Sequence, residues 1–173
     1  MRRITTIRQK VFSYNGFTIV ELLIVIVVIA ILAAITIVAY NGIQNSAYDS
    51  SVQADISNFA KKVELEAAKT STGNYPFPLT QGMGIRASQG AYEVRNNLYY
   101  CENGTSFAIG AISKSGRGFS YDSTNGARTF ANGSASINGG AVCSMAGRGV
   151  WSTTYGDYGL DGPTGTWKSW ATN

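Results

Sequence analysis

Few side chains in this sequence could carry chemistry, and the residue types that are missing narrow the choice. The chain has no histidine and only two cysteines, Cys101 and Cys143. Histidine-dependent hydrolases, histidine-bound metals and a four-ligand Cys/His zinc site are therefore excluded. Glu64 and Glu66 share one short helical stretch, and no third group completes a hydrolytic site around them. We therefore expect a protein that is not an enzyme.

Glu21 is the most unusual ionisable residue, because it stands inside an apolar segment. Between Phe17 and Ala39 only Thr18, Glu21 and Thr36 are not apolar. A carboxylate near the end of a membrane-crossing helix costs about 1–3 kcal/mol, so such a residue indicates a function. Taken alone, a lone charge that reaches the membrane interface explains it equally well.

The apolar segment around Glu21 is long enough to cross a membrane. Residues 22–39 contain no charge, glycine or proline, and a helix of about 18–23 residues spans roughly the ~30 Å of a hydrocarbon core. The basic residues of the N-terminal tip are Arg2, Arg3, Arg8 and Lys10, and no acid occurs before Phe17. This asymmetry predicts a cytoplasmic N-terminus, with residues 40–173 on the other side. A cleaved secretory signal has a shorter apolar run and fits less well.

Residues 15–23 read Asn-Gly-Phe-Thr-Ile-Val-Glu-Leu-Leu. This segment resembles the class III signal of prepilins, the precursors of type IV pilins and of the pseudopilins of type II secretion. The resemblance implies cleavage between Gly16 and Phe17 by a membrane-embedded prepilin peptidase, and N-methylation of the new Phe17 amine. Gly16 has no Cβ, which leaves the peptidase room at the backbone. Glu21 is then expected to form an assembly salt bridge with the Phe17 ammonium of a neighbouring subunit.

The same resemblance implies partners and a location. The expected partners are the prepilin peptidase, an inner-membrane assembly platform, other pilins and copies of this chain in a helical filament. The chain is expected to be a single-pass membrane protein before assembly and part of an extracellular filament afterwards. Specific nucleic-acid binding is not indicated, because residues 74–173 carry seven basic and five acidic residues.

The sequence divides into four segments and predicts an α+β, type IV pilin-like fold. We expect a basic leader that is cleaved (1–16), a transmembrane and polymerisation helix (17–40), an amphipathic extension of that helix (41–72) and a Gly-rich extracytoplasmic β domain (73–173). An apolar stripe at helical spacing predicts the face that packs on an antiparallel sheet; it consists of Val52, Ile56, Phe59, Val63 and Ala67. Six charged residues lie on its other faces and are expected to be solvated: Asp55, Lys61, Lys62, Glu64, Glu66 and Lys69. The helix should end near residues 68–72, before Gly73 and Pro76.

Short apolar runs separated by turn signals predict the strands of this domain. Asn-Gly pairs at 103–104, 125–126, 132–133 and 138–139 are typical of tight hairpins. The candidate strands are 91–101, 106–113, 118–121 and 127–131, with weaker ones at 134–137 and 150–154. Trp151, Trp167 and Trp170 either close the core, which we favour, or form an exposed adhesive surface.

The two cysteines enclose a 43-residue segment on the extracytoplasmic side, where disulfides persist. We therefore expect a Cys101–Cys143 disulfide, with free thiols as the alternative; pilins often carry such a pair. Asp157 and Asp161 are a weak Ca²⁺ candidate, and major pseudopilins bind calcium in a C-terminal loop. EF-hand spacing is absent, however, and a plain turn is the favoured interpretation. No other cofactor is expected.

Three functions are consistent with these features. The leading one is a structural subunit of a type IV pilus-like surface filament that serves adhesion, twitching motility or DNA uptake. The first alternative is a pseudopilin of a type II secretion system. The second is a monomeric membrane-anchored binding module, in which Glu21 would have no role.

Overall fold

The structure is a computed structural model that describes residues 16–92, 96–130, 137–160 and 165–173. The chain divides after Tyr40 into two compact units, which we describe separately. The first contains the apolar part of helix α1. The second, Asn41–Asn173, contains the rest of α1, a five-stranded sheet, helix α3 and a small strand pair.

Helix α1 runs from Ile19 to Lys69. It contains no proline, so the commonest cause of a kink is missing. At its end the backbone N–H of Thr70 donates to the Ala67 carbonyl over 3.1 Å, and Gly73 takes the left-handed conformation with φ of 68°. Glycine adopts that conformation without the steric cost that a Cβ brings. The predicted end of the helix is confirmed.

The main sheet is antiparallel throughout and has the strand order β5-β4-β3-β2-β6. Its strands are β2 (Asn97–Glu102), β3 (Phe107–Ile112), β4 (Gly118–Asp122), β5 (Gly126–Phe130) and β6 (Gly156–Leu160). The β2–β3 and β4–β5 turns contain the predicted Asn-Gly pairs, with φ of 90° at Gly104 and 77° at Gly126. The pilin-like α+β architecture of a long helix and an antiparallel sheet is thus confirmed.

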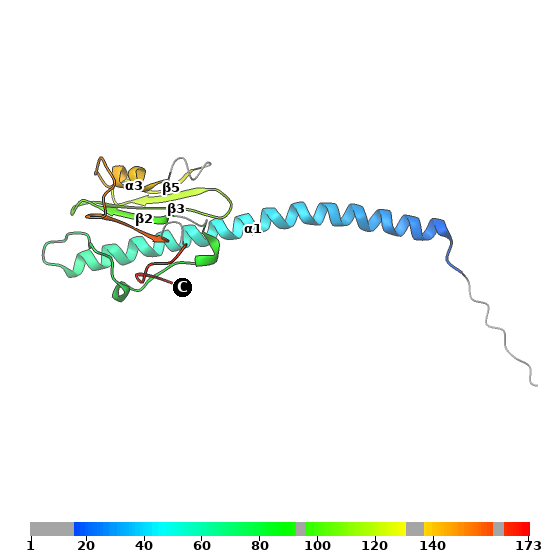
Figure 1. Cartoon of the computed structure of the whole chain (residues 1–173), viewed down its shortest axis with the longest axis horizontal. Coiled ribbons are helices and arrows are strands. Elements are labelled where there is room, and N and C mark those ends of the chain that lie inside the picture. Colours follow the sequence, from blue (N-terminus) through cyan, green and yellow to red (C-terminus); the bar gives the residue numbers. More distant parts are fainter. Residues whose placement is uncertain (1–15, 93–95, 131–136, 161–164) are drawn as a thin grey trace, which may run out of the picture. The chain divides into compact units, whose positions relative to one another are not determined.

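The sheet is covered on both faces, and this explains why every residue of β2 and β3 is buried. Leu98, Tyr100 and Ile109 face α1 and pack with its apolar stripe, all five residues of which are buried. The intervening residues face α3 (Gly139–Met145), as Tyr99 and Ala108 do. Figure 1 shows α1 and α3 on opposite sides of the sheet. The cover by α3 was not predicted.

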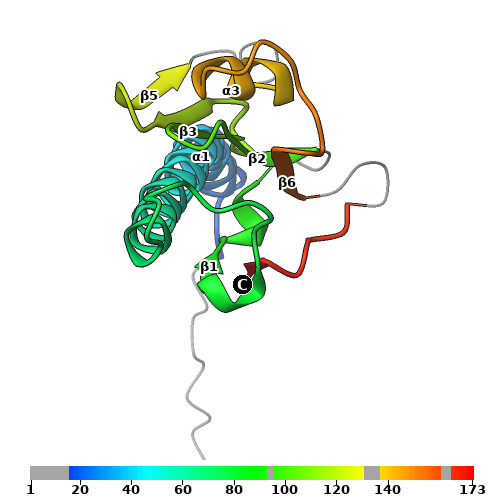
Figure 2. The same ribbon diagram turned by 90° about the vertical axis from the view of Figure 1, so that its left-hand side faces the viewer.

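A second, smaller layer packs against α1. Strand β1 (Ile85–Arg86) pairs in parallel with β7 (Ala171–Thr172), beside two short 3₁₀ helices, η1 (Gln81–Met83) and η2 (Gln89–Ala91). In Figure 2, β1 lies below α1 and the main sheet lies above it. Trp170 belongs to this layer and is buried, with its ring centroid 5.4 Å from that of Phe59. The part of α1 from Asn41 to Lys69, called its upper part below, therefore packs between the main sheet and the β1–β7 pair.

Two sequence predictions for the β domain are wrong, and a third lies almost entirely outside the described residues. Strand β2 begins at Asn97 rather than at Ala91, because Ala91 ends η2. The strand expected at 150–154 is instead β6, where Gly156 lies under the Trp151 ring; a Cβ there would come within 3.1 Å of that ring. The weak candidate at 134–137 lies outside the described residues except for Ile137, which is not in a strand.

The Asn138-Gly139 pair starts a helix instead of closing a hairpin. The Asn138 side chain accepts a hydrogen bond from the Ala141 backbone N–H at 2.9 Å. This is a helix N-cap, which asparagine favours as strongly as it favours tight turns. Two local preferences of one residue type therefore compete here, and α3 forms because its Val142 and Cys143 are fully buried against the sheet.

Candidate functional site

Thr18 and Glu21 form a reciprocal cap at the start of α1. The Thr18 backbone N–H and hydroxyl donate to Glu21 Oε2 at 2.8 and 2.7 Å, and the Glu21 backbone N–H donates to Thr18 Oγ1 at 3.2 Å. This is the capping box, in which a Thr and a Glu three residues later satisfy each other's backbone donors. The Thr-x-x-Glu spacing in the sequence is itself a signal for this cap.

The cap occupies one oxygen of the Glu21 carboxylate and leaves the other available. Both hydrogen bonds to the side chain use Oε2, and within the described residues no hydrogen bond to Oε1 is found. The carboxylate is exposed in the single chain. It can therefore complete the helix end and accept a cation from outside the chain at the same time.

The helix that follows the cap is apolar around its whole circumference. From Ile19 to Ile43 its large apolar side chains are between 47% and 84% exposed. The helix is long and apolar enough to cross a membrane, and its most apolar 18-residue window has none of its residues buried. Thr36, the remaining polar residue, donates its hydroxyl to the Ala33 carbonyl at 2.9 Å. The segment therefore has few polar groups that hydrocarbon would leave unsatisfied.

Comparison with known protein families identifies this segment. Residues 12–37 match the prokaryotic N-terminal methylation motif. The chain carries a class III signal. The methylation motif is typical of type IV pilins and pseudopilins, so the predicted resemblance is confirmed for this part of the chain. No curated protein and no solved structure matches the chain. The motif covers Gly16, Phe17 and Glu21 and does not extend into the β domain.

The methylation motif places its processing residues directly before the helix. Gly16 and Phe17 are exposed and lie outside α1, which begins at Ile19. A Cβ built on Gly16 would have no heavy atom within 4 Å. The predicted leader lies outside the described residues, apart from Gly16. Such a motif together with an apolar N-terminal helix suggests membrane anchoring and later incorporation into a filament.

The predicted disulfide is present. Cys101 on β2 and Cys143 on α3 are bonded, with their Cα atoms 5.0 Å apart. Both residues are fully buried, in the cluster between the sheet and α3. The bond fastens α3 to the face of the sheet that α1 does not cover.

One of the two calcium candidates, Asp157, lies where the sequence did not predict it. Asp157 is not in a turn but in β6, where Oδ1 accepts from the Tyr158 backbone N–H at 2.8 Å and Oδ2 from Trp170 Nε1 at 3.0 Å. Asp161 lies outside the described residues. Within the described residues there is no group of three or more metal-ligating side chains. Calcium binding therefore stays a prediction without structural support.

Two aspartates of α1, Asp49 and Asp55, are buried. The sequence predicted a solvated Asp55 and made no prediction for Asp49. Asp55 accepts hydrogen bonds from the Ser88 backbone N–H at 2.6 Å and from the Tyr92 hydroxyl at 2.9 Å. Burial, with the Asp55 charge as a second cause, raises the pKa of Tyr92 well above its usual range. The expectation of a solvated Asp55 is wrong because Asp55 adjoins the apolar stripe, three residues after Val52.

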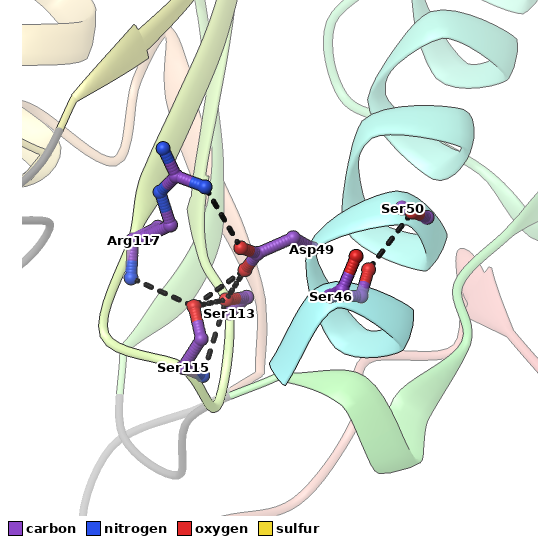
Figure 3. A network of polar contacts seen from close by, with 6 residues as sticks. All are labelled: Ser46, Asp49, Ser50, Ser113, Ser115 and Arg117. Carbon is purple, nitrogen blue, oxygen red and sulfur yellow. Dashed lines mark hydrogen bonds and ion pairs between the residues drawn. The ribbon is translucent and has the colours of Figure 1, made fainter. Parts of the chain in front are cut away.

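Asp49 joins α1 to the turn between β3 and β4. Its Oδ1 accepts from the hydroxyls of Ser113 and Ser115, each at 2.5 Å, and Oδ2 lies 3.4 Å from Arg117 Nη1. Figure 3 shows the carboxylate reaching from α1 into this turn. Asp49 is 6% exposed. A charged group at that depth requires its partners, so the network fixes the turn against the helix.

We predict that Asp49→Ala lowers the free energy of unfolding of the full chain in detergent by about 2 kcal/mol, because a buried hydroxyl loses its acceptor. Arg117→Gln is the matched control. The Arg117 side chain is 56% exposed, so its loss should cost less than about 1 kcal/mol. Urea unfolding of both variants measures the difference. Equal destabilisation by the two variants would contradict a role for the hydroxyl contacts.

Proposed function

We propose that this protein is a structural subunit of a type IV pilus-like filament, polymerised through the apolar part of α1. The observation that carries the proposal is the methylation motif at residues 12–37, which contains the start of an apolar helix that its own chain leaves exposed. Apolar side chains on every side of a helix need lipid or other helices to cover them. Both covers are available to a pilin, lipid before assembly and neighbouring subunits afterwards.

In this proposal residues 1–16 are a leader that prepilin peptidase removes between Gly16 and Phe17, and the new Phe17 amine is methylated. Cleavage removes the four basic residues of the tip, Arg2, Arg3, Arg8 and Lys10. The processed chain thus gains an ammonium at its first residue, Phe17, four positions before Glu21. Residues 17–40 anchor the subunit and polymerise, residues 41–72 continue the helix, and residues 73–173 form the outer domain.

Assembly places the Phe17 ammonium of one subunit beside Glu21 of another. Glu21 Oε1 is the acceptor for this ion pair, because Oε2 is held by Thr18. In an apolar bundle an unpaired charge is costly, and pairing removes two such charges at once. The pair therefore sets the register between neighbouring helices. The assembly platform of the inner membrane and other pilins are the further partners of this proposal.

The test is N-terminal sequencing and intact-mass analysis of the protein from membranes and from sheared fibres of its native host. We expect the chain to begin at a methylated Phe17 in both fractions. A chain that still begins at Met1, or that never crosslinks to a copy of itself through α1, overturns the proposal. The alternative of a membrane-anchored monomer would then hold. Processed protein confined to a short periplasmic fibre would identify a pseudopilin.

A further inference from the structure

Among the cationic side chains of the β domain and the upper part of α1, some contact an acid or an aromatic ring and others do not. The described residues after Gly16 contain nine lysines and arginines. Six of them have a partner: Lys69, Arg117 and Arg128 form ion pairs, and Lys114, Arg148 and Lys168 lie over tyrosine rings. For the other three, Lys61, Lys62 and Arg86, no ion pair, hydrogen bond or ring contact is found within the described residues.

These three cations line one pocket. It is a hollow of about 290 Å³, lined by Asn58, Lys61 and Lys62 of α1 together with Gly84 and Arg86 of the segment around β1. No carboxylate is among these lining residues. Strand β1, which contains Arg86, lies in Figure 2 on the other side of α1 from the main sheet. Two chain segments that are distant in sequence thus bring three positive charges together.

The carboxylates of the described residues are engaged away from this pocket. Each of the eight described Asp and Glu side chains accepts a hydrogen bond within its own chain. Glu64 and Glu66, the nearest in sequence, accept from Tyr121 and Lys69. The domain has nearly equal numbers of bases and acids, yet three positive charges lie together at this pocket without a described acid beside them. Such a pocket attracts an anion from outside the chain.

The backbone leaves space for a ligand among these charges. Gly84 has φ of 63°, and Lys62 Nζ lies 3.8 Å from the place that a Cβ at residue 84 would take. Asn58 precedes Lys62 by four residues on the same helix face and adds neutral amide donors. The Arg86 guanidinium can hold two oxygens of an oxyanion, and the two ammonium groups are strong phosphate donors.

We propose that Lys61, Lys62 and Arg86 form a binding site for a single phosphate group, free or carried by a small phosphate ester. The proposal goes beyond the filament function and does not depend on it. A nucleic-acid backbone is disfavoured, because binding it takes cations along a track. The remaining six described cations are each engaged with another side chain.

The experiment is calorimetric titration of inorganic phosphate into the full chain in an uncharged detergent, at constant ionic strength. We expect saturable binding that Lys62→Gln and Arg86→Gln each weaken about fivefold or more, since each removes a charge-assisted hydrogen bond. Lys69→Gln is the matched control, because that lysine is already bonded to Glu66 at 2.6 Å. It should change the affinity less than twofold. All three side chains are exposed, so the variants should keep the thermal unfolding midpoint of the parent chain.

Three kinds of result overturn the proposal. The first is phosphate binding that is absent in the parent chain, or that all three variants weaken equally. The second is binding of a short DNA duplex at least tenfold tighter than phosphate and lost in Lys62→Gln, which would assign the pocket to a nucleic-acid backbone. A loss of filaments in Lys62→Gln with phosphate binding unchanged would assign it to a contact between subunits, and also excludes the phosphate site.

Discussion

Replacing both Cys101 and Cys143 by alanine is expected to lower the free energy of unfolding by about 4 kcal/mol, because the bond closes a loop with a sequence separation of 42 residues. Total stabilities of single domains are about 5–15 kcal/mol, so this is a large share. Alanine is the suitable replacement, because a serine hydroxyl at either position would be buried without a hydrogen-bond partner. Urea unfolding of the full chain in detergent gives the value.

The structure also predicts which elements become less stable in the variant that lacks the disulfide. Because Cys143 lies on α3, we expect faster amide hydrogen exchange in α3 and in β2, with little change in α1. Ser144→Ala is the matched control, as an exposed residue of the same helix. A loss below about 1 kcal/mol in the double variant would mean that packing alone holds α3 on the sheet.

Glu21→Gln is expected to leave cleavage after Gly16 intact and to reduce the yield of filaments at least tenfold. Glutamine serves at this position of a capping box as glutamate does, so the start of α1 should keep its geometry while the charge is lost. The neighbouring Phe17 ammonium would then be buried without a counter-charge, which is strongly unfavourable. Immunoblotting of sheared surface fractions measures the yield, and N-terminal sequencing measures cleavage.

Thr18→Ala is the complementary variant. It removes the hydroxyl that donates to Glu21 Oε2 at 2.7 Å but keeps the carboxylate charge. Loss of such a cap costs about 1 kcal/mol of helix stability, so filaments should still form. If Thr18→Ala abolishes filaments and Glu21→Gln does not, the cap rather than the ion pair governs assembly. That outcome would refute the proposed role of Glu21.

The apolar part of the chain could be predicted from sequence because its signals are local. Residues 22–39 contain no polar residue other than Thr36, and the Gly-Phe-Thr-Ile-Val-Glu run stands at one fixed place before them. The apolar stripe from Val52 to Ala67 has helical spacing, so its burial against a sheet follows from the period alone. The two cysteines had one pairing within the chain, and the extracytoplasmic location favoured it.

The rest was decided by contacts between distant residues. Asn138 suits a hairpin and a helix N-cap equally, and packing of Val142 and Cys143 on the sheet selects the helix. Strand β6 could not be predicted from sequence, because its glycines disfavour a strand. Gly156 is required there because the Trp151 ring leaves no room for a larger residue. Asp49 became a buried acceptor only through its partners Ser113 and Ser115, 64 and 66 residues away.

The distribution of charge shows most clearly what the sequence predicts and what only the fold determines. Counting bases and acids predicts a nearly neutral domain, and that count is correct. The fold buries or pairs the described carboxylates one by one and leaves Lys61, Lys62 and Arg86 together on one pocket. Which charges remain unpaired depends on how far each side chain lies from a partner. The sequence specifies the charges, while their distances exist only once the chain has folded.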